Sequence, residues 1–251
     1  MRVSDIYAFI DSFAPFSSAE KWDNTELLVG DMNDTVTKAV VCLDVTEKEI
    51  AYALENGAQL IISHHPVIFS PCKNVLAGSV VHSAVSHGLN IISAHTNLDK
   101  AADGVNDALC KLLFDSFTKE DVSIAEGFLN TAVLKEPVSA GSLASHLKNR
   151  LSAGVSYCDS GRTIKKVAVC SGSGADFIEA ALNLGCDAFV TGEASYHKFL
   201  DARQSGISLF AAGHFETEIP VVNALVKKLN EHFDCTVFSA CPQSNTVIME
   251  K

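Results

Sequence analysis

The sequence predicts an α/β protein made of two similar, intertwined lobes related by internal duplication, with mostly parallel sheets and flanking helices. Three observations carry this prediction. Short apolar runs alternate with single helical segments, polar side chains follow the apolar runs directly, and the second half of the chain repeats the pattern of the first. The chain has 251 residues, of which 47% are hydrophobic and 20% charged. It is therefore long and apolar enough for one large or two small packed domains.

The first half of the chain is expected to alternate three strands with two helices. Thr46 and Glu49 form a capping box that predicts the start of the first helix, and Asn56-Gly57 predicts its end. A second helix over about residues 79–87 stops at Gly88. Because single helices separate the strands, these should pair in parallel. The expected strands are residues 38–43, 59–63 and 90–94.

The middle of the chain has weaker patterns. A strand is expected near residues 128–134 and a helix near residues 143–151, before the alternation resumes with a strand at 166–171. No linker rich in proline or glycine marks a boundary. We therefore expect a first lobe over about residues 1–115 and a second over 116–251, with a C-terminal segment that could pack on the first lobe.

The second half resembles a repeat of the first. Shifting the chain by 128 positions aligns six identical residues without a gap. They are Val41, Cys42, Ile50, Ala53, Leu54 and Gly57, which fall on Val169, Cys170, Ile178, Ala181, Leu182 and Gly185. After a change of register, His95 and Asp99 match His214 and Glu218, each pair being a histidine followed four positions later by an acid.

Charge and cysteine usage exclude several classes. The formal net charge of −11 opposes general binding to nucleic acid or to an anionic membrane. Asp5 and Asp11 interrupt any signal-peptide core, and no run reaches the roughly 18 apolar residues of a membrane span. The eight cysteines form no C-x-x-C pair. Reduced, mostly buried thiols in a cytoplasmic protein are therefore expected.

Imidazole and carboxylate groups follow the expected strands, and this is where ligands bind in open α/β sheets. These groups are His64, His65, His95, Asp99, Glu193, His214 and Glu218. Such donors bind Zn²⁺, Mn²⁺, Fe²⁺ or Ni²⁺. Their number exceeds what one ion needs and favours two ions that share a bridging carboxylate, an arrangement suited to hydrolysis.

Each group also has a purely structural interpretation. Asp99 could cap the helix that follows it, and this interpretation is about as well supported as ligation when Asp99 is taken alone. His214 and Glu218 could form one turn of a helix starting near Glu216. His64-His65 is harder to explain structurally, since adjacent strand residues point to opposite faces unless the chain turns. The joint occurrence of all these groups favours metal binding.

Other candidate residues carry weaker indications. His197 follows Glu193 by four positions and could face the same cleft or lie on the surface. The segment Ser171–Gly174 lacks the full G-x-G-x-x-G spacing, so a tight turn is preferred over a phosphate-binding loop. The remaining histidines, which have no comparable context and are expected on the surface, are His82, His87, His146 and His232.

At these residues the sequence resembles the NIF-three-like dinuclear-metal family, often labelled GTP cyclohydrolase 1 type 2, over nearly its whole length. The motifs that carry the resemblance are Trp22-Asp23-Asn24, Leu43-Asp44-Val45-Thr46, Ile62-Ser63-His64-His65-Pro66, His95-Thr96-Asn97-Leu98-Asp99, Gly172-Ser173-Gly174, Thr191-Gly192-Glu193 and Gly213-His214 with Glu218. The resemblance implies a toroidal homohexamer whose sites face an inner cavity. It also implies two metal ions bound by His64, His65, Asp99, His214 and Glu218, with Asp99 and Glu218 positioned to bridge the ions. His95 would lie beside them.

The chain departs from the family pattern at two places. The family usually has glycine where this chain has Glu26, and the large domain inserted in some members is absent.

The sequence leaves two functions open. The first is a metal-dependent hydrolase acting on a small molecule such as a nucleotide, with cyclohydrolysis of GTP or cleavage of a phosphoester as the reaction. His95 or Glu193 would move protons. The alternative is a non-catalytic metal-binding scaffold or regulatory protein.

Overall fold

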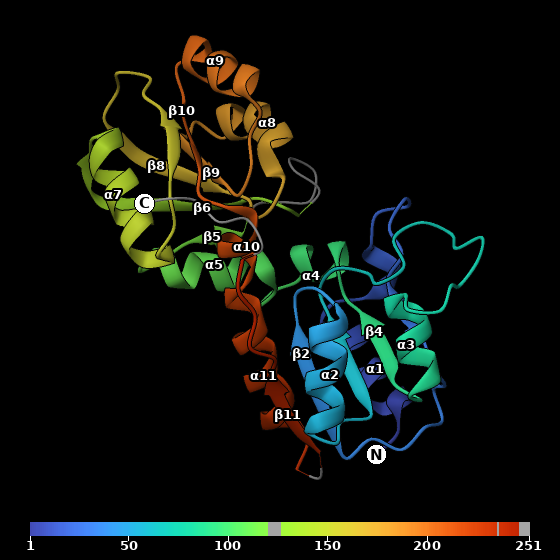
Figure 1. Cartoon of the computed structure of the whole chain (residues 1–251). Coiled ribbons are helices and arrows are strands. Elements are labelled where there is room, and N and C mark those ends of the chain that lie inside the picture. Colours follow the sequence, from blue (N-terminus) through green and yellow to red (C-terminus); the bar gives the residue numbers. More distant parts are fainter. Residues whose placement is uncertain (120–126, 235, 246–251) are drawn as a thin grey trace. The chain divides into compact units, whose positions relative to one another are not determined.

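The computed structural model describes residues 1–119, 127–234 and 236–245, which fold into two compact units (Figure 1). Unit 1 contains Met1–Gly104 and Val222–Ser244, and unit 2 contains Val105–Val221 with Asn245. The chain therefore passes from one unit to the other three times, so neither unit is a single continuous segment.

Unit 1 is built on a five-stranded sheet in the order β1-β4-β3-β2-β11. Its strands are β1 (Glu26–Val29), β2 (Lys38–Cys42), β3 (Leu60–Ser63), β4 (Asn90–Ser93) and β11 (Val237–Ala240). Strands β4, β3, β2 and β11 pair in parallel, and β1 joins β4 antiparallel. Its helices are α1 (Val3–Phe13), η1 (Phe16–Ser18), α2 (Glu47–Glu55), α3 (Val80–Ser86), α4 (Thr96–Lys100) and α11 (Pro220–His232), the last beginning in unit 2.

The sheet of unit 1 is buried on both sides, as its unbroken apolar strands predict. Val40, Ile61 and Ile91 pack with Ile50 of α2 and Ala84 of α3 in one core cluster. Figure 1 shows α2 and α3 in front of this sheet and α1 behind it. Polar side chains of this sheet are therefore accessible only at the ends of its strands, and the candidate site residues lie there.

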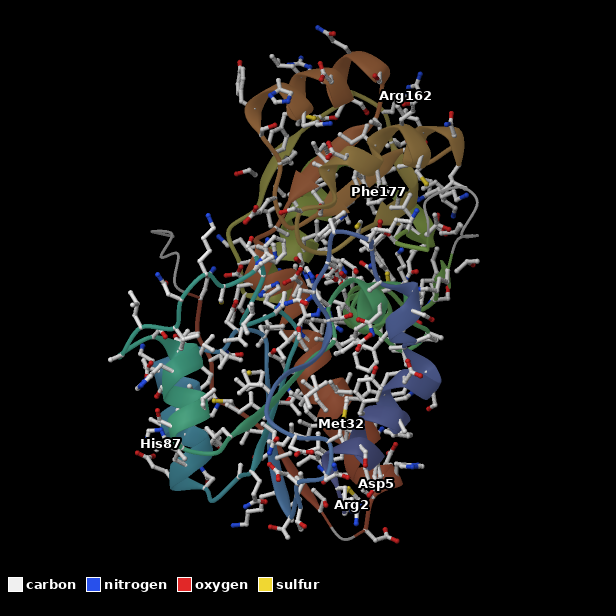
Figure 2. All side chains as sticks on the ribbon, turned by 90° about the vertical axis from the view of Figure 1, so that its right-hand side faces the viewer. Arg2, Asp5, Met32, His87, Arg162 and Phe177 are labelled. Carbon is white, nitrogen blue, oxygen red and sulfur yellow. The ribbon has the colours of Figure 1, made fainter. Side chains whose placement is uncertain are left out.

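Helix α1 is anchored at its start by backbone contacts. The Arg2 N–H donates to Asp5 Oδ2 at 2.8 Å, and the Ser4 N–H donates to the Met32 carbonyl at 2.9 Å. Figure 2 shows Arg2, Asp5 and Met32 at this end of unit 1. These bonds satisfy amides that the first turn of a helix leaves without intrahelical acceptors.

Helix α2 has the capping box that the sequence predicts. Thr46 Oγ1 accepts from the Lys48 N–H at 3.2 Å, and Glu49 Oε2 accepts from the Thr46 N–H at 2.9 Å. We expect Thr46→Ala to destabilise the protein by about 1 kcal/mol, because the cap acceptor is lost. Thermal unfolding should show a lower midpoint for Thr46→Ala and a nearly parental one for Thr46→Ser. Equal midpoints for all three proteins would contradict the assigned cap.

Unit 2 is built on a six-stranded sheet in the order β5-β6-β8-β9-β10-β7. Its strands are β5 (Thr118–Lys119), β6 (Asn130–Val138), β7 (Ser156–Cys158), β8 (Ile164–Val169), β9 (Ala188–Thr191) and β10 (Ser208–Ala211). Strands β8, β9 and β10 are parallel, and the other pairings are antiparallel. Its helices are α5 (Val105–Leu113), α7 (Ala140–Leu151), η2 (Gly174–Phe177), α8 (Ile178–Asn183), α9 (Tyr196–Ser205) and α10 (His214–Glu218).

Two core clusters cover the two faces of the unit 2 sheet. Val167 and Phe210 belong to the cluster that includes residues of α5 and α7. Phe189 belongs to the cluster that includes Ile178 and Ala202 of α8 and α9, with Phe177 packed at its margin. Figure 2 shows Phe177 beside these helices. Both faces of the sheet are therefore covered by helices, and its polar loops lie at the strand ends.

The duplication is visible in the topology. In unit 1 the order of elements is β2-α2-β3-α3-β4-α4, and in unit 2 it is β8-η2-α8-β9-α9-β10-α10. The offset of 128 places β3 (Leu60–Ser63) on β9 (Ala188–Thr191), residue for residue. Both parallel cores also carry one antiparallel neighbour at the same side, β1 beside β4 and β7 beside β10. The predicted α/β fold with two related sheets is thus confirmed.

No disulfide joins the cysteines of the described residues, and most of these thiols are buried. Burial raises the pKa of the Cys110 thiol to about 12. Cys72 is exposed, and Cys235 lies outside the described residues. In the described part of the chain, none of the helices is both long and apolar enough to cross a membrane.

Candidate metal centre

The parallel register of unit 1 gathers polar residues at one edge of its sheet. Cys42 pairs with Ser63 and Ser63 with Ser93, so β2, β3 and β4 end side by side. His64 follows β3 directly, and His95 follows β4 after one intervening residue. The carboxyl ends of neighbouring parallel strands thus bring together side chains that are 31 positions apart in the sequence.

His64 and His65 are held in place by different acceptors. His64 Nδ1 lies 3.0 Å from the Ala94 carbonyl oxygen, and its ring is buried. His65 Nδ1 lies 2.8 Å from Asp44 Oδ1. A carbonyl and a carboxylate both accept, so each Nδ1 carries the proton, and each Nε2 keeps its lone pair in the neutral ring.

His95 is held by a buried carboxylate. Its Nδ1 lies 2.8 Å from Asp23 Oδ1, and Asp23 Oδ2 accepts from the Thr96 N–H at 3.0 Å. Burial alone would raise the pKa of Asp23, but the hydrogen bonds from His95 and Thr96 outweigh it and lower this pKa to about 2. Asp23 is therefore a carboxylate at neutral pH, and it fixes the tautomer of His95 as Asp44 fixes that of His65.

The three imidazole rings converge. One nitrogen atom of each of His64, His65 and His95 lies within 4.8 Å of the others. Asp99 adds a carboxylate, with its Oδ1 3.6 Å from His64 Nε2. Histidines whose Nδ1–H is bound by a carbonyl or carboxylate are the usual form of histidine ligands to transition metals. Unit 1 therefore offers a donor set that fits Zn²⁺ or a similar ion.

Asp99 does not occupy the helix-capping position that its structural interpretation requires. It lies inside the short helix α4, and the next helix begins only at Val105. His95 is the residue at the N-cap of α4, with a backbone conformation outside the helical region. The capping interpretation of Asp99 thus loses its geometric basis.

Unit 2 carries a second group of the predicted residues. His214 is the first residue of α10, and its Nε2 lies 3.1 Å from Glu218 Oε2, one helical turn later. On its other side, His214 Nδ1 lies 3.3 Å from Glu193 Oε1. Glu218 is buried, whereas the Glu193 side chain is 60% exposed. The imidazole is thus oriented between a buried and an exposed carboxylate.

The backbone approaches this pair closely at Gly172. A Cβ atom at this position would lie 2.2 Å from Glu218 Oε1 and 3.3 Å from His214 Nε2. Gly172 also has a φ of +59°, a conformation that side chains disfavour. Only glycine therefore leaves the Glu218 carboxylate in this position.

The backbone amides of the glycine-rich loop Ser171–Gly174 donate hydrogen bonds to side chains of the protein itself. The N–H groups of Ser171, Gly172 and Gly174 donate to Asn106 Oδ1, Thr217 Oγ1 and Thr191 Oγ1 at 2.7, 3.1 and 3.0 Å. Donors occupied in this way are not presented to a phosphate. This geometry agrees with the tight turn expected from the sequence.

A cavity of about 630 Å³ lies beside His214 within unit 2. Its lining includes Glu193, Ser173 and Lys198. Ser173 Oγ donates to Glu193 Oε2 at 3.1 Å, and Lys198 Nζ lies 2.7 Å from Asp176 Oδ1. The volume is in the range of small-molecule sites.

The remaining histidines have local structural contacts. His197 is exposed, with its ring 3.3 Å from Ser195 Oγ. His87 is exposed at the end of α3, as Figure 2 shows, and His146 Nε2 lies 2.7 Å from the Leu113 carbonyl. His232 stacks on Phe9 with ring centroids 3.8 Å apart.

Sequence reasoning missed the residues that orient the histidines. Asp44 had a usable indication, since it follows the first parallel strand just as the histidines follow the next two. Asp23 belongs to the Trp22-Asp23-Asn24 motif, but nothing in the sequence links it to His95, because 72 positions separate the two and no spacing rule joins them. Its role comes from the fold of the segment before β1.

The chain is similar to known proteins over nearly all of its length. The sequence model of the family described as Duf34/NIF3 (NGG1p interacting factor 3) matches residues 1–245. A Clostridium acetobutylicum protein named GTP cyclohydrolase 1 type 2 homolog is 36% identical over 240 residues, covering 91% of this chain and 90% of the relative. A protein of the same name from Clostridium perfringens is 34% identical over 247 residues, covering 94% of each.

A solved structure shares the fold. The crystal structure of Staphylococcus aureus protein SA1388 superposes with a TM-score of 0.91 at 26% sequence identity. The match covers 100% of this chain and 99% of that one. The fold with two α/β units is therefore shared with that protein.

Proposed function

From the premise that this chain belongs to the Duf34/NIF3 family, we propose that it binds two divalent metal ions and acts as a metal-dependent hydrolase. The substrate class is a nucleotide or another phosphoester. The proposed ligands are His64, His65, Asp99, His214 and Glu218. The ions would be Zn²⁺, Mn²⁺, Fe²⁺ or Ni²⁺, which suit mixed imidazole and carboxylate donors.

The observation that carries the proposal is the set of anchored histidines in unit 1. The Nδ1 atoms of His64, His65 and His95 are bound by Ala94, Asp44 and Asp23 at 2.8–3.0 Å. A hydrogen bond at Nδ1 fixes the tautomer and the orientation of the ring, which is what a histidine needs when its Nε2 binds an ion or transfers a proton. A purely structural histidine needs no partner of this kind at three neighbouring positions.

Unit 2 supports the proposal independently. Glu218 is buried within 3.1 Å of His214, with Gly172 leaving it the space that any side chain would fill. A buried carboxylate beside an imidazole is costly to keep unless it is paired or coordinates a cation. Unit 2 thus offers an imidazole and a carboxylate, the same types of donor as unit 1.

The ions, when bound, would acidify water and polarise the group under attack. His95 is proposed to take and return a proton at Nε2, because Asp23 holds the proton on Nδ1. Glu193 remains the second candidate for proton transfer. Its contact with His214 Nδ1 also gives it an orienting role toward that imidazole.

The relatives' names suggest which reaction to test first. Two of them are named GTP cyclohydrolase 1 type 2 homolog, so the first reaction to test is attack of water on a purine ring carbon of GTP. The cavity beside His214 offers room for a small molecule. As the resemblance implies a homohexameric ring, that assembly is part of the proposal.

A non-catalytic metal-binding scaffold or regulatory protein is the second candidate. The family description refers to an interacting factor, which favours a role in binding partners. Both candidates need the metal ions, but only the hydrolase needs turnover. Incubation of metal-loaded protein with GTP and a panel of phosphoesters separates them, and no metal-dependent turnover would favour the scaffold.

We expect about two transition-metal ions per chain, because the donors exceed what one ion needs. Elemental analysis should be done on protein purified without chelator, and again after dialysis and reloading with Zn²⁺ or Mn²⁺. A reproducible content near zero after reloading would overturn the metal proposal for both candidates.

A further inference from the structure

Two large aromatic side chains of unit 1 lie exposed beside the histidine cluster. Trp22 is 60% exposed and Phe69 is 55% exposed. Their ring centroids are 6.0 Å apart, and those of Trp22 and Phe69 lie 6.2 and 6.5 Å from the His95 ring. His95 in turn lies 5.1 Å from the His64 ring. Trp22 and Phe69 thus form an apolar wall beside His95, which in turn neighbours the proposed ligand His64.

The segment that carries Trp22 is fixed by polar contacts on both sides of that residue. The Glu20 N–H donates to Thr96 Oγ1 at 2.9 Å, and Glu20 forms an ion pair with Lys100. Asp23 bonds to His95 and Thr96, as described above. The backbone is therefore held against α4 while the indole ring points away from the core.

The segment that carries Phe69 is tied to the same place. Asn24 Nδ2 donates to the Ile68 carbonyl, so residues on either side of the Trp22–Phe69 contact are joined. Figure 1 shows the connection between β3 and α3 as a long loop standing away from the sheet of unit 1. Two exposed rings that are fixed by hydrogen bonds rather than by burial have a face available for a ligand.

We propose that Trp22 and Phe69 bind a planar heteroaromatic ring of the substrate, so that the ring lies next to His95. This inference rests on the proposed function and specifies its substrate class. Aromatic side chains bind flat heteroaromatic rings by stacking on their π-faces, and they tolerate different ring substituents. A sugar phosphate without such a ring would gain nothing from this wall.

The chain offers a direct probe, because Trp22 is its one tryptophan. Zn²⁺-loaded protein should be titrated with guanosine, GMP and ribose 5-phosphate while indole fluorescence is recorded, with free N-acetyltryptophanamide as the control for light absorption by the ligand. We expect saturable quenching by guanosine and GMP and none by ribose 5-phosphate. Absence of saturable quenching by every ring-containing ligand would overturn the inference and leave the metal proposal standing.

Phe69→Ala should weaken binding of guanosine about tenfold, since stacking on one aromatic side chain commonly contributes an effect of that order. The matched control is Leu76→Ala, which removes an apolar side chain that is 64% exposed in the same loop. It should bind guanosine like the parent. Both variants should keep the parental metal content, which separates this inference from the proposed function.

Three results would overturn the inference at this step. The first is an unchanged affinity of Phe69→Ala for guanosine. The second is a loss of metal from this variant, which would mean that the ring supports the metal site. The third is a smaller assembly mass by light scattering with unchanged affinity, which would assign the two rings to an interface between copies of the chain.

Discussion

Replacing Asp99 by asparagine is expected to release both metal ions. A bridging carboxylate gives one oxygen to each ion and offsets the repulsion between them, whereas a neutral amide does neither well. We expect the affinity for each ion to fall on the order of a hundredfold or more, beyond what loss of an orienting group produces. Elemental analysis after dialysis should be compared for the parent, Asp99→Asn and His64→Ala, and the last should mainly lose one ion.

The matched control for Asp99→Asn is Asp103→Asn. Asp103 lies four positions later, is paired with Lys228 at 3.3 Å and has a φ of +60°, a conformation that asparagine tolerates. This variant should keep two ions and a parental melting temperature, because exposed ion pairs contribute little. If Asp99→Asn also retains both ions at parental affinity, the bridging role is wrong, and the case for two ions rather than one loses its main support.

Local patterns explain why so much of the fold was predictable. The Thr46–Glu49 capping box and Gly88 act through neighbouring residues. In the structure α2 begins after Thr46 and α3 ends just before Gly88, as those residues indicate. Runs of apolar residues such as Leu60–Ser63 are buried on both sides of a parallel sheet, as their composition requires. Because the second half repeats the first at an offset of 128 residues, the same buried parallel strands could be predicted for unit 2.

The duplication is less regular at the site than in the core. Strands β4 and β10 align at one offset, yet His95 precedes α4 as its N-cap whereas His214 is the first residue of α10. The two pairs of histidine and acid therefore enter their helices one residue apart. Core packing tolerates no such shift, but loops at strand ends do, which is why sequence matching alone could not fix the positions of these side chains.

Contacts between distant segments were beyond sequence reasoning. Asp23 holds His95 through a loop whose path no local pattern specifies. Glu26 has a φ of +85°, so the chain keeps a glycine-like turn at the position where the resembling family usually has glycine. That conformation costs free energy for a residue with a side chain, and the neighbouring strand and loop contacts must compensate it.

Gly172→Ala is expected to destabilise unit 2 and to displace the Glu218 carboxylate. The added Cβ would lie 2.2 Å from Glu218 Oε1 and would occupy a φ of +59°. The left-handed conformation costs about 1–2 kcal/mol for alanine, and forcing the carboxylate aside adds about 1–3 kcal/mol. Because Glu218 is a proposed ligand, the variant should also bind less metal.

Gly185→Ala separates the two costs. Gly185 has a φ of +69° in the same unit, but nothing lies within 4 Å of the added Cβ, so this variant bears the backbone cost alone. We expect its melting temperature to fall by several degrees with the metal content unchanged. Gly172→Ala should melt lower still and lose metal. Equal melting temperatures and equal metal contents for the two variants would show that Gly172 is needed only for its turn, and that the Glu218 carboxylate does not depend on the space beside it.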